Sequence, residues 1–290
     1  MTIRPLLLVL FVLTISSCEK TFEIPIPEES NKLVLNLLMN KDSIMMARVT
    51  VSGRLSDMQA GPDITNAEVK LYENGTYKET LTPYLHSGRM FYRGNTLPQT
   101  GVTYRVTAAV HGYKEVSGSD KIPDTAKVGE MKLTVSQLNT WTSRATINVQ
   151  LHDDPEVQNY YRIRLYYINE WVDANGNGGR QKLQQYFEAG EADLPLFNED
   201  VKGEFYTTDE LFNGRSPRFI FRANIGSNYK KMVVEITSLT YNSYNYLNST
   251  FMAMEKNDEG LAEKVIVYNN IENGLGIIGG VAQREYELAK

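Results

Sequence analysis

Apolar and polar residues alternate along most of the chain after residue 31, in short runs separated by turn-forming residues. Alternation with a period of two places successive side chains on opposite faces of a strand, so these runs predict half-buried β-strands. The strongest turn signal is Asn74-Gly75, which favours a two-residue hairpin between two such runs. In the first half we expect strands at 32–39, 47–52, 67–73, 76–81 and 103–110.

The second half repeats this pattern with longer strands, expected at 145–151, 160–172, 180–188, 218–222 and 231–239. Residues 193–213 show little periodicity, which predicts a long loop with one helical turn. One stretch has helical spacing, and it predicts a helix over 240–256 whose aromatic stripe packs on a core rather than serving as a shelf for a ligand. The stripe consists of Tyr241, Tyr244, Leu247, Phe251 and Met254.

Glycines are concentrated in the tail, residues 265–280. Gly274-x-Gly276-x-x-Gly279 shares the glycine spacing of a phosphate-binding loop, but no βαβ unit follows it. We therefore expect a final strand and a tight turn packed on the helix.

Many closely spaced strands and a single helix predict a mainly β protein with two antiparallel β-sandwich domains, the helix packed on the second. The hairpin at Asn74-Gly75, followed by the strand that starts at Gly101-Val-Thr-Tyr104 and by Gly112-Tyr113, resembles immunoglobulin-like or transthyretin-like domains. Pro123-Asp124 marks a boundary, so the domains are expected at 32–125 and 126–290.

Residues 1–17 have the parts of a secretory signal peptide: an early Arg4, an apolar run from Leu6 to Leu13, then small residues. The longer run from Pro5 to Ile15 is about half the ~20 apolar residues that a membrane-spanning helix needs. Ile15-Ser16-Ser17-Cys18 resembles the lipobox of bacterial lipoproteins, and this implies lipidation of Cys18 after removal of the leader. An unmodified thiol beside a cleavage site is the alternative.

Composition supports an anchored, exported chain. Cys18 is its only cysteine, so no disulfide framework can form. Residues 18–31 contain Pro25 and Pro27, which predict an extended tether with a reach of about 40 Å at ~3.1 Å per residue. A formal net charge of −5 gives no basic footprint for nucleic acid.

A possible metal site follows the longest predicted strand. Asp173, Asn175 and Asn177 lie at alternate positions, as the oxygen ligands of a calcium loop do. The twelfth position is Gln184 instead of a bidentate glutamate, so we prefer a hairpin loop without a metal.

Other candidate chemistry is sparse. His86, His111 and His152 are far apart and lack zinc-ligand spacing, so we expect them at the surface or at strand ends. Asp153 and Asp154 could form an acid/base pair for glycoside cleavage, but directly before a proline they are better interpreted as turn residues. The sequence therefore predicts no catalytic residues, no cofactor and no identifiable ligand.

Motifs along nearly the whole chain resemble a Bacteroidota lipoprotein family catalogued as domain of unknown function 4249. They are Cys18-Glu19-Lys20, the strand at 32–39, Ala67-x-Val69-x-Leu71 before Asn74-Gly75, Gly101-Val-Thr-Tyr104, Asp153-Asp-Pro155 leading into Asn159-Tyr-Tyr161, the helix YNSYNYLNS and Asn269-Asn-Ile-Glu-Asn-Gly-Leu-Gly276. The resemblance implies an outer-membrane lipoprotein that accompanies TonB-dependent transporters, and it supplies no catalytic residues.

These patterns favour a non-enzymatic binding or accessory module. We expect it to be lipid-anchored in the outer membrane, exposed on the cell surface, and placed beside a TonB-dependent transporter in nutrient uptake; the periplasmic face is the alternative location. Glu19 supports the outer membrane, because an aspartate there would resemble an inner-membrane retention signal. A structural or adhesive surface protein is the second hypothesis, and a hydrolase the third.

Overall fold

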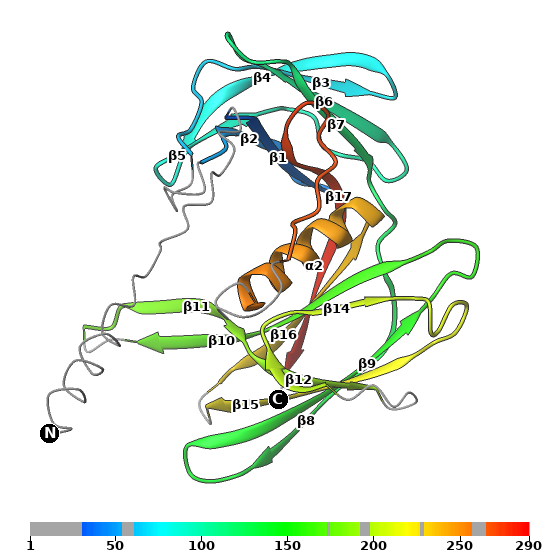
Figure 1. Cartoon of the computed structure of the whole chain (residues 1–290). Coiled ribbons are helices and arrows are strands. Elements are labelled where there is room, and N and C mark those ends of the chain that lie inside the picture. Colours follow the sequence, from blue (N-terminus) through cyan, green and yellow to red (C-terminus); the bar gives the residue numbers. More distant parts are fainter. Residues whose placement is uncertain are drawn as a thin grey trace, which may run out of the picture. The chain divides into compact units, whose positions relative to one another are not determined.

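The computed structural model describes residues 31–53, 61–172, 175–191, 198–226, 229–256 and 265–289. This part of the chain folds into seventeen strands and one helix, so the predicted mainly β class is confirmed (Figure 1). The strands are β1 (Leu33–Asn40), β2 (Met46–Val51), β3 (Glu68–Glu73), β4 (Thr76–His86), β5 (Arg89–Arg93), β6 (Thr103–Ala109), β7 (Val116–Lys121), β8 (Lys127–Gln137), β9 (Thr142–His152), β10 (Tyr160–Val172), β11 (Gly178–Gln185), β12 (Phe187–Glu191), β13 (Asn198–Lys202), β14 (Phe205–Thr208), β15 (Arg218–Gly226), β16 (Lys231–Leu239) and β17 (Leu275–Ala289), and the helix is α2 (Tyr241–Lys256).

All the strands expected from alternation are present, and β10 and β16 match to the residue. No strand is predicted at β5, β7 or β8, although Met131, Leu133 and Val135 alternate along β8 and pack on the second core. The loop predicted for 193–213 is wrong, because β13 and β14 lie inside it. β14 has only four residues, which is too short to show a period, yet Phe205 packs on one core and Tyr206 on another.

Two sheets contain all these strands. Twelve strands form one sheet in the order β11-β10-β16-β17-β1-β2-β5-β4-β3-β6-β7, with β14 paired to β10; five form the other, in the order β13-β12-β15-β9-β8. Neighbouring strands of the described residues pair antiparallel, with the exception of the parallel pair β1–β17.

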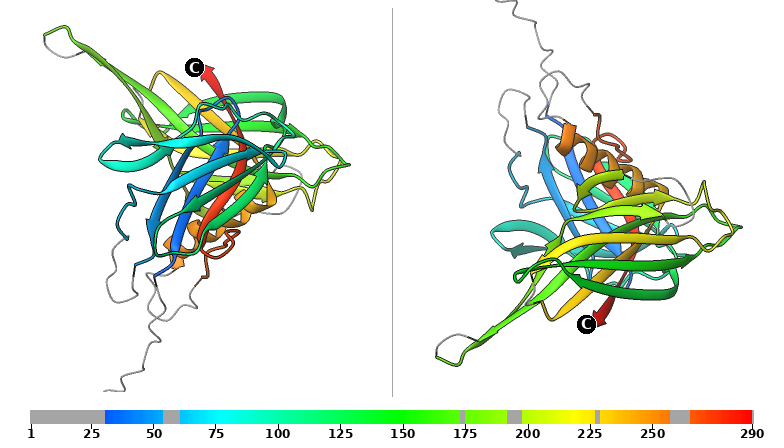
Figure 2. Two further views of the ribbon diagram at one scale, coloured as in Figure 1. Left: turned by 90° about the horizontal axis from the view of Figure 1, so that it is seen from above. Right: turned by 90° about the horizontal axis from the view of Figure 1, so that it is seen from below.

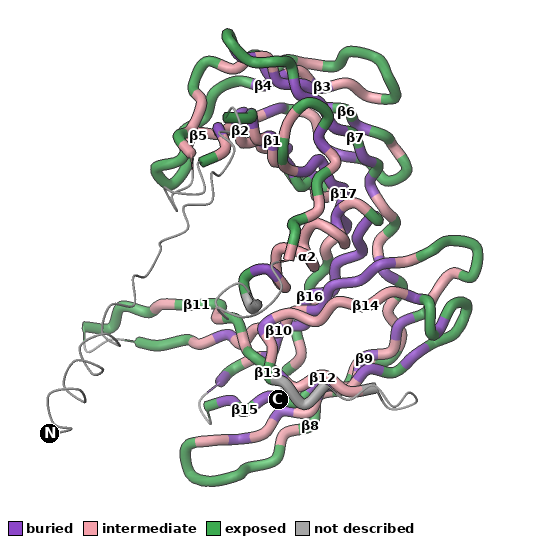
Figure 3. Tube along the Cα trace, in the orientation of Figure 1, coloured by how far each residue is buried: buried purple, intermediate pink, exposed green. Residues whose placement is uncertain are grey.

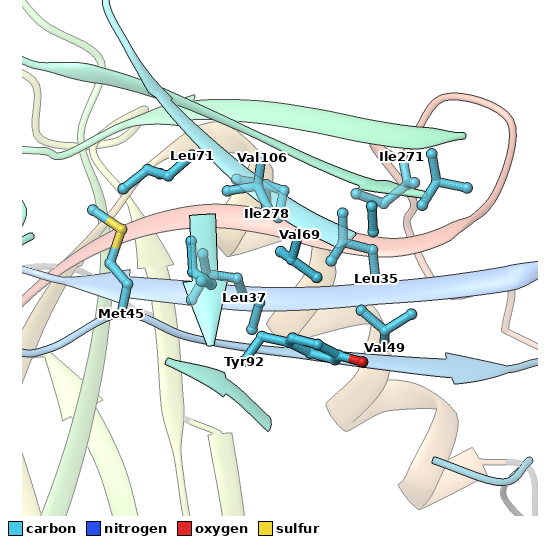
Figure 4. Close-up of a cluster of buried hydrophobic side chains, with 14 of the residues drawn as sticks. Leu35, Leu37, Met45, Val49, Val69, Leu71, Tyr92, Val106, Ile271 and Ile278 are labelled. Atoms are coloured by element: carbon cyan, nitrogen blue, oxygen red, sulfur yellow. The ribbon is translucent and has the colours of Figure 1, made fainter. Parts of the chain in front are cut away.

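The first sandwich forms where the long sheet turns back on itself. β4 pairs with β3 through Thr76–Leu81 and with β5 through Thr82–His86, so one strand changes partners along its length. Alternate residues of β1 and β2 then face the inward residues of β3 and β6 across a common core (Figure 4). Tyr92 is fully buried there, and its hydroxyl donates to Ile64 O and accepts from Ala67 N.

The second sandwich packs the five-stranded sheet against β10, β16 and β17. Phe187, Phe219 and Phe221 form an aromatic cluster at its centre. Helix α2 lies on the opposite face of the β10–β16–β17 sheet, where Tyr244 and Leu247 pack on apolar residues of these strands, as the aromatic stripe predicts. Tyr241 and Met254, at the two ends of the stripe, are exposed instead. The alternation of buried and exposed segments along the strands is visible in Figure 3.

The C-terminal strand belongs to both sandwiches. Residues 275–281 of β17 pair with β1, and residues 281–289 pair with β16. Ile271 and Ile278 lie in the core of the first sandwich (Figure 4). Residues 31–290 form one compact unit, and the boundary expected at residue 125 stays a prediction.

The signal peptide, Cys18 and residues 18–30 of the tether lie outside the described residues. No helix within the described residues has both the length and the apolar composition needed to cross a membrane.

Candidate functional site

A band of charged side chains crosses the outward face of the sheet formed by β11, β10, β16 and β17. The strand register defines it, because directly opposed residues point to the same side. Arg164 lies opposite Glu235, which lies opposite Glu285 on β17. We call this face the charged face. It comprises the polar residues on this side of the four strands, together with Tyr206 of β14 and Glu204 just before it.

The inner part of the charged face is a buried ion cluster. The Arg164 guanidinium donates from Nε to Glu235 Oε1 at 2.7 Å and from Nη2 to Glu235 Oε2 at 2.9 Å, a bidentate pair. Arg162 is more loosely held, with its Nη2 3.5 Å from Glu235 Oε1. Its buried Nε has no hydrogen-bond partner among the described residues. Glu204 completes the cluster through Arg164 Nη1 at 3.4 Å and through the Tyr206 hydroxyl.

The outer part is a ladder of half-exposed ion pairs. Lys182 Nζ lies 2.5 Å from Glu285 Oε1, and Lys231 Nζ lies 2.7 Å from Glu287 Oε2. Arg180 reaches the other oxygen of Glu287 at 3.2 Å. These pairs tie the edge strand β11 across β10 and β16 to the C-terminal strand.

Tyr166 joins the two parts. Its ring lies between Arg164, 5.6 Å away, and Lys182, whose Nζ is 4.1 Å from the ring centroid. Its hydroxyl donates to Glu235 Oε2 at 3.3 Å. Burial and the neighbouring Glu235 charge raise the pKa of Tyr166 to about 12, so the phenol stays protonated and acts as a donor.

The electrostatics of the cluster favour fixed charges. Burial alone would lower the pKa of Arg164, but the charge and hydrogen bonds of Glu235 outweigh it and raise that pKa. Burial and the bond to Glu204 raise the pKa of Tyr206 well above its ordinary value. The two phenols donate within the cluster, whereas the half-exposed outer ion pairs present fixed charges, and this chemistry suits recognition of a polar surface.

The metal candidates are only partly within the described residues. Asp173 lies outside them, while Asn175 and Asn177 lie in the turn between β10 and β11, with Gly176 at a φ of 84°. Among the described residues, no three His, Cys, Asp or Glu side chains come together as a metal ion would require.

The three histidines lie where the sequence places them. His86 and His152 are the last residues of β4 and β9, and His111 is exposed just after β6. The His152 Nδ1 is 2.8 Å from Ser216 Oγ, a hydrogen bond between a strand end and a neighbouring loop.

Asp153 and Asp154 hold two different loops. Asp153 accepts from the Tyr161 hydroxyl at 3.1 Å and from Gly214 N at 2.9 Å. Asp154 accepts from Glu156 N at 3.1 Å, which closes a turn of its own. Both carboxylates thus make the hydrogen bonds expected of turn and loop residues.

The Asn269–Gly276 segment, which we call the clasp, packs β17 between β1 and β7. The Asn270 side chain donates to Ile278 O at 2.8 Å and accepts from Ile278 N at 3.0 Å, so it imitates a neighbouring strand. A Cβ at Gly274 would lie 2.6 Å from Leu33 O, and one at Gly276 would lie 2.2 Å from Leu35 O. The glycines allow close approach of backbones, so the interpretation as a final strand packed on the helix fits and that of a phosphate loop does not.

A hollow of about 370 Å³ opens beside the β3–β4 hairpin of the first sandwich. Glu73 and Lys78 form an ion pair of 2.9 Å in its wall, and the Tyr104 hydroxyl accepts from Gln99 N. Its polar groups therefore largely satisfy one another.

Sequence reasoning missed the charged face. Arg162 and Arg164 alternate with apolar residues inside a correctly predicted strand, and Glu235 lies in another. Alternation could have placed the two arginines on one face, but the partner strand that supplies Glu235 lies about seventy residues further along the chain.

The fold and this surface define a two-sandwich β protein with a charged sheet face and a C-terminal strand shared by both cores. The chain belongs to the family described as domain of unknown function (DUF4249), whose model matches residues 19–287. No curated protein matches the sequence.

One similar solved structure is CfaE, the adhesive subunit of the CFA/I fimbria of enterotoxigenic Escherichia coli. The two share 8% sequence identity over 89% of this chain and 88% of that chain, with a TM-score of 0.23, a value at which the likeness carries no functional argument.

Proposed function

We propose that this protein is a non-enzymatic interaction module, lipid-anchored through Cys18 at the outer membrane and acting beside a TonB-dependent transporter in nutrient uptake. The lipobox-like Ile15-Ser16-Ser17-Cys18 and the extended segment that follows support the anchor. The family resemblance supports the location and the transporter.

The charged face is the observation that carries the interaction role. Its ion pairs lie on an outward sheet face, and two of its members, Arg162 and Glu235, are buried there. Burying charges is costly unless the pair geometry is good and the remaining hydrogen bonds are made, and we infer that these charges are kept for specificity. A sheet face with fixed, half-exposed charges suits a protein partner of complementary charge better than a small substrate, which needs a concave site.

Lipidation is tested by incorporation of labelled palmitate into the wild type and Cys18→Ala, followed by protease treatment of intact cells. We expect label only in the wild type and digestion of the protein by external protease. A wild-type chain without label would remove the anchor, and complete protection from protease would move the protein to the periplasmic face.

The charged face is tested by extraction in mild detergent and identification of any co-purifying outer-membrane barrel. The double variant Glu285→Lys/Glu287→Lys reverses two half-exposed charges, and we expect at least about a tenfold lower recovery of the barrel, since a close charge pair can contribute more than 1.4 kcal/mol. The matched control is Glu68→Lys, an exposed ion-pair residue of the first sandwich. Purification of the wild type without any barrel, or equal recovery of the barrel with all variants, contradicts the proposal. A deletion of the gene that changes cell attachment but not nutrient uptake also contradicts it.

A further inference from the structure

A small ligand needs a concave site, and the hollow beside the β3–β4 hairpin is one. Its volume of about 370 Å³ lies at the lower end of the range of about 300–1,000 Å³ that small-molecule sites have, so it has room for one small molecule. Its walls come from the end of β3, the start of β4, the start of β6 and the loop 95–99 between β5 and β6. The left view of Figure 2 looks down on β3 and β4, which are drawn in cyan.

Hydrogen bonds fix the walls of the hollow. Glu79 accepts from Thr96 N at 2.8 Å and from Asn95 N at 3.0 Å, so it holds the loop against β4. Burial alone would raise the pKa of Glu79, but these hydrogen bonds outweigh it and lower that pKa, so the carboxylate stays charged. On the other side, the Asn74 side chain accepts from Thr103 N, and Asn74 N donates to Thr103 O, which ties the hairpin turn to β6. Walls that are already ordered lower the entropic cost of binding.

Three polar side chains of the hollow keep hydrogen-bonding capacity that no other described residue uses. Glu73 pairs with Lys78 through Oε2 at 2.9 Å, which leaves Oε1 without a donor and leaves the ammonium, a group with three donors, able to donate to a ligand. Tyr104 lies directly opposite Glu73 in the sheet and is 1% exposed. Its hydroxyl accepts from Gln99 N at 3.1 Å, but the hydroxyl proton has no acceptor among the described residues. A negatively charged acceptor therefore lies beside two donors, one of which is positively charged.

The charges of this wall favour a ligand that carries both signs. A net anion would be attracted by Lys78 and repelled by Glu73, and a net cation would meet the reverse. An α-amino acid in its zwitterionic form has a carboxylate and an ammonium on one carbon, so its two charges lie as close together as those of the ion pair. A sugar could use the same hydrogen bonds, but it would leave both charges without opposite partners. Tyr104 is the only aromatic residue of the lining, so no open ring is offered to the apolar face of a sugar.

We propose that the hollow binds a free α-amino acid as its zwitterion. The carboxylate of the ligand accepts from Lys78 Nζ and from the Tyr104 hydroxyl, and its ammonium donates to Glu73 Oε1. The four charges then alternate in sign, so the ion pair of the wall stays closed while each of its members gains a second opposite charge. The side chain of the ligand contacts Leu97, the apolar residue of the lining, which is 51% exposed, and this favours an aliphatic amino acid.

The inference deepens the proposed role in nutrient uptake, because it names the class of nutrient, and it rests on that role for the use of the ligand. Binding itself is measured on the purified protein. Absence of binding would remove this inference and leave the lipid anchor and the charged face unaffected. Failure to recover a barrel would remove the proposed partner and leave a positive binding result intact.

The test is saturation-transfer NMR on the full-length mature protein in mild detergent, with L-leucine as the probe. Two analogues each lack one charge: L-leucinamide keeps the ammonium, and 4-methylpentanoate keeps the carboxylate. We expect both to bind at least about tenfold more weakly than leucine, because each loses one of two close charge pairs. Glycyl-L-leucine carries its two charges far apart, and a tenfold or greater loss with this dipeptide distinguishes a free amino acid from the end of a peptide.

Variants of the wall test the same pairing from the side of the protein. Glu73→Gln and Lys78→Met each remove one charge, and we expect the affinity for leucine to fall at least about tenfold. Lys78→Met should not weaken leucinamide further, since that ligand has no carboxylate. The matched controls are Glu68→Gln and Lys70→Met, because these two residues form an ion pair of the same 2.9 Å on the same strand, outside the lining of the hollow. They should leave the affinity for leucine unchanged.

Other results overturn the inference. No transfer to leucine at millimolar concentration, equal binding of leucine and both analogues, or an equal loss with the control variants would each exclude the pairing of charges. Binding of D-glucose without binding of leucine would assign the hollow to a sugar instead.

Discussion

Gly280 lies where the C-terminal strand, β7 and the start of α2 meet. A Cβ on this residue would be 1.8 Å from Lys121 O, and one on Gly279 would be 2.3 Å from Ser243 Oγ. The Gly280 carbonyl accepts from Ser243 Oγ at 2.9 Å, and its N–H donates to Asp120. Gly280 is therefore required by the close approach of the β7 backbone, and Gly279 by the Ser243 side chain.

Gly280→Ala should lower the free energy of unfolding by at least about 2 kcal/mol, because β7 or β17 must shift to make room for the methyl group. Gly178→Ala is the control, since the nearest atom to its added Cβ is Trp171 O at 3.6 Å, and we expect a change within about 0.5 kcal/mol. Urea unfolding of both variants gives the two values. Equal stability of the variants would mean that the close approach at Gly280 relaxes without strain.

Asp120, at the same junction, makes the stability of the protein depend on pH. Burial raises the pKa of its carboxyl above the ordinary value, although hydrogen bonds from Thr240, Gly280 and Lys121 oppose the rise. A raised pKa in the folded state means that the protonated group adds stability below its unfolded pKa of about 3.9, and that this contribution is lost as the pH rises through the folded pKa. The wild type should therefore lose stability relative to Asp120→Asn as the pH rises above about 3.9 and through the raised pKa of the folded state. A stability difference that stays constant with pH would contradict this assignment.

At the scale of elements, the clasp explains why a tail of glycines and asparagines ends a β protein. Asn273 has a φ of 59°, and its side chain donates to Glu115 O at 3.2 Å, so the turn is fixed on β7. Ile271 then enters the first core beside Gly118, where a Cβ would lie 2.6 Å from it. The Asn269–Gly276 motif of the family resemblance thus has a structural role.

Asn270→Ala removes both hydrogen bonds to the Ile278 peptide, and we expect a loss of about 2–3 kcal/mol because the partner groups are part-buried. Asn245→Ala is the matched control, since its side chain donates to Tyr241 O at an exposed position of α2, and its effect should stay within about 0.5 kcal/mol. Hydrogen exchange should show the loss of protection at β1 and β17 first. Unchanged hydrogen-exchange protection of β1 and β17 would show that the clasp does not stabilise their pairing.

The strands that sequence reasoning identified are those with a clear period of two, whereas β7 was missed for a physical reason. Its buried positions include Ser117, Gly118 and Asp120, residue types that are typical of loops. They are buried because of contacts with the clasp and with Thr240, which come from distant parts of the chain. The parallel pairing of β1 with β17 joins residues more than two hundred positions apart, and no local pattern encodes it. The anchor motif is a local sequence pattern and could be predicted. The charged face could not, because it depends on the pairing of strands that are far apart in the sequence.

At the scale of the molecule, β17 makes the two sandwiches dependent on one another. β1 is paired on one edge with β2 and on the other with β17, and the first core takes two isoleucines from the C-terminal segment. A fragment that ends at the expected domain boundary would leave one edge of β1 open and a gap in its core, and an open edge is prone to pair with other chains.

We therefore expect a fragment of residues 31–126 to lack a cooperative unfolding transition and to aggregate, although it contains all of β1 to β7. Adding a synthetic peptide of residues 265–289 should restore cooperative unfolding and protect the β1 amides from exchange, because it returns the missing strand and both isoleucines. A peptide with Ile271 and Ile278 replaced by alanine is the control, and it should fail because each lost aliphatic side chain costs about 2–5 kcal/mol. A fragment that folds alone would show that the first sandwich is an independent domain to which β17 is merely added.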